Sequence, residues 1–219
     1  MREPINVSGM VLSASPVGEY DKRVVILTRE LGKITAFARG ARRMKSPLMA
    51  VSNPFVFGEF QVYEGRDSYT LSGANIKEYF LDLAQMQPGV YYGFYFLELA
   101  EYFGQEGNDE TQMLNLLYVT MNAIRRGKQD LRLIRCIFEL RTITISGEAP
   151  QMFSCMECGT KENLTVFSLR DSAIYCPNCG KTIRDPWPLQ PGTVLACRYI
   201  IAAPLAKLYG FTVNEEILD

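Results

Sequence analysis

Residues 22–39 have the sequence KRVVILTRELGKITAFAR, and this stretch decides the first part of the fold. Two runs rich in β-branched and aromatic side chains, residues 22–29 and 33–39, flank residues 30–32. Such runs favour strands, and a short connection that ends in glycine favours a tight turn, because glycine reaches backbone angles that other residues avoid. The stretch therefore predicts a β-hairpin with Gly32 in its turn.

Three further strand-like runs lie on either side of this hairpin. Residues 6–14 precede it, and residues 55–64 and 69–76 follow it as a second pair across residues 65–67. Five short strands within the first 80 residues predict a small closed β-barrel of the OB type, with a five-stranded sandwich as the alternative. Between the third and fourth strands lies a long basic connection, residues 40–54.

The first helical pattern, residues 90–103, is crowded with aromatic side chains. A helix that is apolar nearly all round is usually buried, so we expect a core helix here. The alternative is an apolar groove that receives a partner peptide.

Further helices are predicted at residues 110–126 and 131–145, and helical patterns return at residues 193–209, broken by Pro204. Residues with capping preferences mark the ends of the first two. These are Asp109 and Asp130 before the helices and Gly127 after the first of them.

The net charge of the 219 residues is only −1, but the charges are unevenly distributed. Residues 1–80 have a balance of +3 and residues 81–219 one of −4. A basic N-terminal part suggests an anionic ligand.

Neither a signal peptide nor an apolar stretch of about 18 residues is present, so we expect a cytoplasmic protein without a membrane span.

Six cysteines without a secretion signal point to a reducing compartment, where cysteine pairs bind metal more often than they form disulfides. Four of them form the motifs Cys155-Met-Glu-Cys158 and Cys176-Pro-Asn-Cys179, separated by seventeen residues. Two such knuckles, joined by a short hairpin, supply the four thiolates that zinc binds in a tetrahedron. The pattern therefore predicts one Zn²⁺ held by Cys155, Cys158, Cys176 and Cys179.

Four thiolates close the coordination shell, and the chain contains no histidine that could serve as a base. The predicted zinc is therefore structural. A redox C-x-x-C motif and unligated buried thiols are the alternatives. The remaining Cys136 and Cys197 lie in apolar helical patterns, which favours core positions over metal binding.

Residues 32–45, GKITAFARGARRMK, contain five basic side chains and no acid. Arginine and lysine bind phosphates, and Gly40 would let the backbone approach closely. The run lies where the third predicted strand leaves the barrel, and OB barrels bind single strands across that face and its loops. We therefore predict a DNA-binding site here, with an ordinary solvated loop as the alternative. The predicted site residues are Lys33, Arg39, Arg42, Arg43 and Lys45.

A second basic group suits the end of a helix, where the helix dipole favours cations; an extended DNA surface is the alternative. It comprises Arg125, Arg126, Lys128, Arg132 and Arg135.

The sequence contains no Walker-type loop, no dinucleotide fingerprint, no G-x-S-x-G motif and no triad with histidine. We therefore expect no enzymatic activity and no catalytic residues.

Two sets of residues carry a family resemblance and cover residues 5–80 and 132–180. The first set is Gly9, Val11-Leu12, Glu19 to Asp21, Leu27-Thr28, Glu30, Gly32-Lys33 and the string Ala38-Arg39-Gly40-Ala41-Arg42-Arg43 with Ser46. The second is Phe138-Glu139-Leu140, Gly147, Pro150, Cys155-x-x-Cys158-Gly159, Phe167-Ser168 and Cys176-x-x-Cys179. With these residues the chain resembles the RecO family of bacterial recombination mediators.

The resemblance implies a multidomain α+β protein in which an N-terminal OB-type five-stranded β-barrel precedes a helical domain that carries a four-cysteine zinc finger. The expected domains are residues 1–80 (OB-fold, DNA-binding), 81–150 (helical), 151–187 (zinc finger) and 188–219 (a helical segment that packs on the helical domain). Family members bind single- and double-stranded DNA and anneal complementary strands without ATP. With a RecR partner they help load RecA onto DNA coated by single-stranded-DNA-binding protein, whose C-terminal tail they also bind.

The leading hypothesis is therefore a DNA recombination and repair mediator. Two rivals come from other classes. A protein-interaction adaptor with weak DNA binding would rely on the aromatic helix and the zinc knuckles. A zinc-dependent enzyme would need a metal position that exchanges with solvent.

Overall fold

The computed structural model describes residues 3–218 and forms two compact units, Met1–Lys128 and Gln129–Asp219. The outer ends of the first and last predicted domains, residues 1–2 and 219, lie outside the described residues. The division into four domains stays a prediction. Within residues 3–218, no helix has the length and apolar character needed to cross a membrane.

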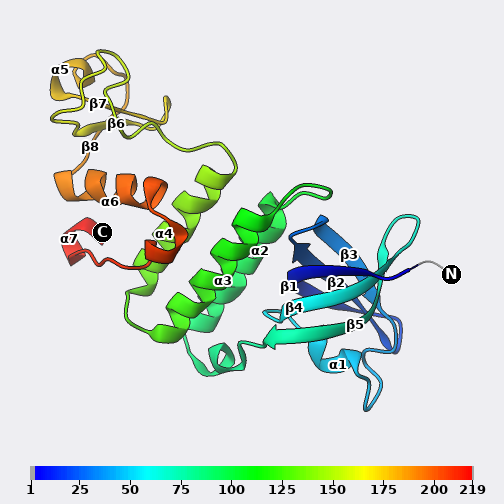
Figure 1. The fold of residues 1–219 in the computed structure, drawn as a ribbon. Coiled ribbons are helices and arrows are strands. Elements are labelled where there is room, and N and C mark those ends of the chain that lie inside the picture. The colour runs from blue at the N-terminus through cyan, green and yellow to red at the C-terminus, as the bar shows by residue number, and fades with distance from the viewer. Residues whose placement is uncertain (1–2, 219) are drawn as a thin grey trace. The chain divides into compact units, whose positions relative to one another are not determined.

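The first unit contains a closed five-stranded barrel (Figure 1). Its strands are β1 Ile5–Val17, β2 Asp21–Thr28, β3 Gly32–Ala38, β4 Phe57–Glu64 and β5 Tyr69–Glu78. The strand order is β1-β2-β3-β5-β4, and β4 pairs back onto β1. This arrangement confirms the predicted barrel and excludes the sandwich.

Strand β3 shows why this sequence builds a barrel wall. Its side chains alternate between buried and half-buried, as a strand with one face toward a core requires. Ile34 and Ala36 point into an apolar interior that also contains Val24, Phe60 and Leu71. The barrel closes where β3 meets β5 in a short parallel pairing of Ala36 with Tyr69.

The predicted hairpin turn between β2 and β3 is confirmed. Gly32 has φ +69°, a left-handed angle that favours glycine. The turn also packs against the chain after helix α2 (Gly89–Phe103), because Lys33 N donates to Gln105 O at 2.9 Å and Gly107 N donates to Leu31 O at 3.0 Å.

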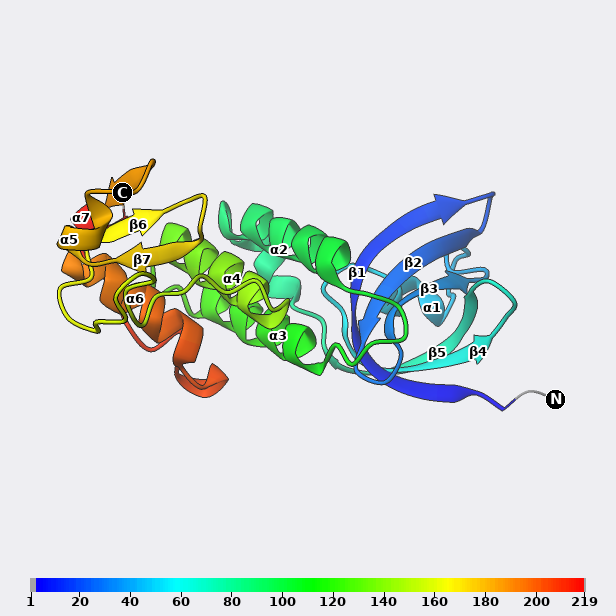
Figure 2. The ribbon, with the colours of Figure 1, turned by 90° about the horizontal axis from the view of Figure 1, so that it is seen from above.

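Helices α2 and α3 Thr111–Arg126 run side by side next to the barrel (Figure 2), and the 3-10 turn η1 Leu81–Gln85 contacts both of them. The short helix α1 Leu48–Val51 packs against β5 instead. Aromatic contacts join α2 and α3 to the barrel segments. The ring centroids of Phe57 and Tyr118 lie 4.7 Å apart, as do those of Phe55 and Phe94.

Helix α2 differs from the prediction of a helix buried all round. One face is buried through Val90, Phe96, Leu97 and Ala100, whereas aromatic side chains lie on the opposite face. The exposed ones are Tyr91, Phe94, Tyr95 and Tyr102, the last with 80% of its surface exposed. The prediction was wrong because most of the exposed face is aromatic, and Glu98 and Glu101 are the only two charged residues of this helix.

The predicted helix ends are largely confirmed. Gly127 follows α3 with φ +59°. Asp130 caps helix α4 (Leu131–Ile145), and its side chain accepts a hydrogen bond from Arg132 N at 2.7 Å. Helix α3 begins one residue later than predicted, but Asp109 Oδ1 still accepts from Thr111 N at 2.9 Å.

The second unit combines helices with a small three-stranded sheet (Figure 1). After α4 come β6 Val166–Ser168, β7 Ala173–Tyr175, α5 Pro177–Gly180, β8 Pro186–Pro188, α6 Pro191–Ala202, η2 Leu205–Lys207 and α7 Glu215–Leu218. The sheet order is β7-β6-β8; the β6–β7 hairpin matches the predicted one, and β8 was not predicted. Helix α6 packs on α4, where Arg141 Nη1 donates to Ile200 O at 3.0 Å.

Candidate nucleic-acid interface and metal centre

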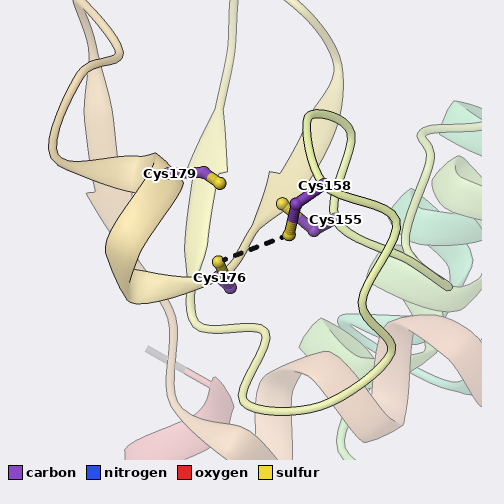
Figure 3. A group of neighbouring side chains, drawn as sticks. All are labelled: Cys155, Cys158, Cys176 and Cys179. Carbon is purple, nitrogen blue, oxygen red and sulfur yellow. Dashed lines mark hydrogen bonds between the residues drawn. The ribbon is translucent and has the colours of Figure 1, made fainter.

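The four predicted cysteines come together at one end of the small sheet (Figure 3). Cys155 and Cys158 lie in the loop before β6, whereas Cys176 and Cys179 flank the start of α5. Their sulfur atoms lie within 4.8 Å of one another, with 3.9 Å between Cys158 Sγ and Cys176 Sγ. A tetrahedron with Zn–S bonds of about 2.3 Å requires sulfur separations of roughly 3.8 Å, so the group can hold a metal ion.

The glycines after the knuckles allow this approach for two different reasons. Gly159 has φ +74°, and its backbone N–H donates to Cys155 O at 2.9 Å. At Gly180 the angle is ordinary, but a Cβ atom would lie 2.8 Å from Val166 Cγ2. The first knuckle therefore needs a left-handed residue, and the second needs a residue without a side chain.

The electrostatics of the thiols also suit a cation. Burial raises the pKa of Cys155, but backbone N–H groups beside its sulfur outweigh this effect and lower the pKa to about 6. The backbone N–H of Cys179 lowers the pKa of Cys176. The pKa of Cys179 rises to about 12, because its thiol is hydrogen-bonded to Cys176 among the other sulfurs. Cys179 therefore becomes a thiolate at neutral pH only with a positive charge between the sulfur atoms.

The other two cysteines do not join this group. Cys136 and Cys197 are half-buried on α4 and α6. Burial raises the pKa of both thiols, which keeps them protonated. Both lie outside the four-cysteine cluster, but the predicted core positions are only half-buried.

The basic run leaves the barrel at the end of β3 and forms the basic loop, residues 39–47, before α1. Ala41 is fully buried and anchors the loop in the barrel interior. On either side of this anchor the side chains of Arg39, Arg42, Arg43 and Lys45 reach the surface, and all four are exposed. Four of the five predicted DNA-binding residues therefore lie on one loop.

The basic loop is tied to the turn between β1 and β2, residues 18–20. Gly40 N donates to Asp21 Oδ1 at 2.7 Å, and Arg42 N donates to Tyr20 O at 2.8 Å. The guanidinium of Arg42 also donates to Gly18 O at 3.2 Å. These contacts fix the backbone from which the cations project.

Two residues near the basic loop were missed by the sequence analysis. Lys22, at the start of β2, has its pKa lowered by burial and by the charge of Arg42, and its Nζ donates to Asn53 Oδ1 at 2.7 Å. The Tyr20 ring lies 4.9 Å from the Arg43 guanidinium carbon. A single lysine at a strand start and a single tyrosine in a turn carry no distinctive sequence pattern.

Lys33 lies apart from the basic loop. It is at the opposite end of β3 from Arg39, six residues and roughly 20 Å along an extended strand. Its Nζ donates to Glu101 O at 2.6 Å, near the C-terminal end of α2, where the helix dipole favours a cation. A role for Lys33 in binding DNA stays a prediction.

Ion pairs occupy most of the second basic group. Arg125 pairs with Glu78 and Asp82, and the guanidinium carbon of Arg125 also lies 5.4 Å from the ring of Phe80. In the second unit, Arg132 pairs with Asp130 and Glu215, and Arg135 with Glu139. Arg126 and Lys128 are exposed.

The fold and site define a class: an OB-type barrel with an exposed basic loop, followed by helices and a four-cysteine cluster. Two family models match the chain. The one described as recombination protein O N terminal matches residues 1–80, and the one described as recombination protein O C terminal matches residues 89–219. The chain belongs to the RecO family of DNA repair proteins.

Individual relatives agree with this assignment. The chain is 33% identical over 214 residues to the DNA repair protein RecO of Alkaliphilus metalliredigens, covering 97% of this chain and 87% of that protein. It is 28% identical to that of Acetivibrio thermocellus, covering 98% and 86%, and 28% identical to that of Bacillus subtilis, covering 95% and 81%.

Proposed function

We propose that this chain is a DNA repair and recombination mediator that binds single- and double-stranded DNA and anneals complementary strands without ATP. The observation that carries the proposal is the basic loop of the barrel, whose Arg39, Arg42, Arg43 and Lys45 share a backbone held in place by Asp21. Such cations neutralise phosphates on two strands and let them approach closely enough to pair. No step of this function calls for a catalytic residue.

In this proposal the chain works with protein partners. A RecR-like protein and this chain together promote loading of RecA onto single-stranded DNA that is coated by single-stranded-DNA-binding protein. The chain also binds the acidic and apolar C-terminal tail of the coating protein, for which the exposed aromatic side chains of α2 offer an apolar surface. Membership of the RecO family supports these assignments. The site of action is the cytoplasm, at the nucleoid.

We also propose that Cys155, Cys158, Cys176 and Cys179 hold one structural Zn²⁺. The sulfur separations fit zinc, and four thiolates leave no coordination position for water or substrate. The metal would supply a crosslink between the two knuckles. The small sheet of the second unit, which is only three strands wide, gains its rigidity from this crosslink.

The proposed function is tested by annealing of two labelled complementary oligonucleotides without ATP, for the wild type and for Arg39/Arg42/Arg43→Ala. Fast annealing by the wild type and its loss in the variant are the expected results. A matched control, Arg126/Lys128/Arg135→Ala, removes the same charge from the second basic group. Equal losses in both variants would show that net charge, and not the basic loop, promotes annealing.

Salt dependence gives a second test. Each lost phosphate contact lowers the slope of log affinity against log salt concentration by about one. We expect Arg39/Arg42/Arg43→Ala to flatten this slope by up to about three, and to weaken binding equally across DNA sequences. Fluorescence anisotropy titrations at several salt concentrations measure the slope. An unchanged slope overturns the assignment of the basic loop.

The adaptor hypothesis predicts different results. Wild-type annealing would be absent both alone and with the RecR-like partner, and DNA binding would vanish at moderate salt, while protein partners would still bind tightly.

A further inference from the structure

Tyr20 is an exposed aromatic side chain within a cationic surface. It occupies the turn between β1 and β2, and 42% of its surface is exposed. Its ring lies 4.9 Å from the guanidinium carbon of Arg43. The pair therefore combines an aromatic face with a positive charge, at the place where the proposed function puts DNA.

The position of Tyr20 is fixed on both sides. Strands β1 and β2 pair up to the turn itself, ending with Val17 opposite Asp21. The carbonyl oxygen of Tyr20 accepts from Arg42 N at 2.8 Å, which joins the turn to the basic loop. A ring on such a backbone loses little conformational entropy when a ligand stacks on it.

The neighbouring charges identify the ligand that suits this ring. Arg39, Arg42, Arg43 and Lys45 reach the surface on the adjoining basic loop. A polyanion is favoured here over an apolar peptide. An apolar peptide would remove water from these cations and offer no negative charge in return, which costs free energy. An anionic polymer that also carries flat aromatic groups is a nucleic acid.

Phosphate contacts by themselves give no preference for single strands, because a duplex carries a higher density of backbone charge than a single strand does. Stacking does distinguish them, since the faces of paired bases lie inside the duplex and those of unpaired bases are free. Resting on the proposed function, we infer that Tyr20, supported by Arg43, stacks on an unpaired base. Tyr20 then gives the basic loop a preference for single strands over duplex.

A purely structural role for Tyr20 predicts a different pattern. If the ring only orders Arg43, then its removal would weaken one phosphate contact on every ligand. The stacking role therefore requires a selective loss that depends on the bases and not on the phosphates.

The test compares three labelled probes of equal length: an oligothymidylate, an abasic oligomer with the same phosphates, and a duplex. Affinities are measured by fluorescence anisotropy for the full chain and for Tyr20→Leu. We expect the variant to bind the oligothymidylate about 5- to 150-fold more weakly, the range for loss of one base–aromatic stack. Binding of the abasic oligomer and of the duplex should not change.

Two variants serve as controls. Tyr20→Phe keeps the ring and should bind all three probes like the wild type. Tyr63→Leu removes another exposed tyrosine, 38% exposed on β4, and should leave the oligothymidylate affinity unchanged. Thermal unfolding followed by circular dichroism checks that the Tyr20→Leu variant is folded.

A second measurement locates the contact directly. The complex of the protein with an oligonucleotide that carries 5-iodouracil is irradiated, and the cross-linked peptide is identified by mass spectrometry. The stacking role predicts a cross-link at Tyr20.

The outcomes separate the stacking role from the function on which it rests. If the wild type binds DNA but Tyr20→Leu weakens all three probes equally, or none, the stacking role is overturned and the proposed function stands. If the wild type binds no probe, the proposed function fails and the stacking role fails with it.

Discussion

At the scale of single residues, Asp21 places a carboxylate among side chains that we assign to phosphate binding. Its Oδ1 atom accepts a hydrogen bond from Gly40 N near the beginning of the basic loop. The same negative charge repels a polyanion. Asp21 therefore has two opposing effects on DNA binding, one through geometry and one through charge, and two substitutions can separate them.

Asp21→Asn keeps an acceptor oxygen and removes the charge, so we expect it to bind DNA more tightly than the wild type at low salt. Asp21→Ala removes both, and should bind less tightly than Asp21→Asn by about 1 kcal/mol, roughly fivefold, the typical contribution of one hydrogen bond. Anisotropy titrations of a labelled oligonucleotide measure all three affinities. Equal affinities of the two variants would contradict a positioning role for Asp21.

The close contact between the β2–β3 turn and Gln105 depends on glycine at position 32. Its φ is +69°, and an added Cβ atom would lie 2.2 Å from Gln105 O. We expect Gly32→Ala to lower the free energy of unfolding by at least about 2 kcal/mol, from backbone strain and the clash together.

The matched control is Gly107→Ala, which has φ +76° but open space around the added atom. Here only the left-handed angle is unfavourable, so a loss of about 1 kcal/mol is expected. Urea unfolding of both variants gives the two free energies. Similar losses would mean that the contact with Gln105 contributes nothing.

At the scale of elements, the last turn of α3 is fastened to the chain between β5 and η1. Arg125 pairs with Glu78 on one side and with Asp82 on the other, and its guanidinium covers the ring of Phe80. Phe80 itself has φ +50°, an angle that is uncommon for a bulky residue. The cation that the helix dipole favours at this end thus also holds a strained connection in place.

This ion pair makes stability depend on pH. Burial raises the pKa of Glu78, but the hydrogen bond and charge of Arg125, together with the backbone N–H groups of Phe80 and Tyr79, outweigh burial and leave the pKa lowered. The folded-state pKa thus lies below the unfolded value of about 4.3. The stabilisation is therefore complete above that unfolded value and is lost as the pH falls through the folded pKa.

We expect Arg125→Gln to lower the free energy of unfolding by about 1 kcal/mol at neutral pH, because solvent screens these partly exposed charges. The difference from the wild type should shrink below about pH 4, where Glu78 becomes protonated. Urea unfolding across this pH range tests the prediction, with Arg126→Gln as a control at the exposed neighbour. A difference that stays constant with pH would exclude Glu78 as the partner that matters.

At the scale of the whole molecule, the two units have separate sources of stability. The first has a closed barrel with an apolar interior, in which Ile26, Ile34 and Phe60 are fully buried. The second has a smaller core, which includes Leu164, Ile174 and Val194 and directly adjoins the cysteines. We therefore expect metal removal to affect the second unit and to spare the first.

Structural zinc sites contribute on the order of 10 kcal/mol of folding free energy in zinc-finger peptides, which is comparable to the stability of a whole domain. Treatment with a chelator, or the substitution Cys176→Ser, should therefore abolish the cooperative unfolding transition of the second unit. Calorimetry measures this transition, and an oligonucleotide titration measures the basic loop. Loss of DNA binding together with the metal would contradict the assignment of DNA binding to the barrel. Cys136→Ser serves as the control, because Cys136 lies outside the four-cysteine cluster.

Local patterns in the sequence were sufficient for much of the fold. The β2–β3 hairpin, the number of strands in the barrel, the cap at Asp130 and the left-handed Gly127 were all predicted and are all present. The four-cysteine cluster was predicted from spacing alone. Each of these features depends on residues close together in the chain, or on a spacing that allows few arrangements.

Other features depended on contacts between distant segments. The closure of β3 against β5 pairs residues far apart in sequence, and no local pattern specifies it. Strand geometry placed Lys33 at the far end of β3, whereas the turn at residues 18–20 brought Tyr20 to Arg43.

What the sequence determined by itself was therefore the set of elements, the candidate ligands of a metal and the presence of a basic loop. The tertiary structure alone decided which cations share a surface, which aromatic ring lies among them, and which face of α2 is exposed. The physical reason is that burial and side-chain proximity arise from packing of the whole chain, whereas turns, caps and knuckles are specified by a few neighbouring residues.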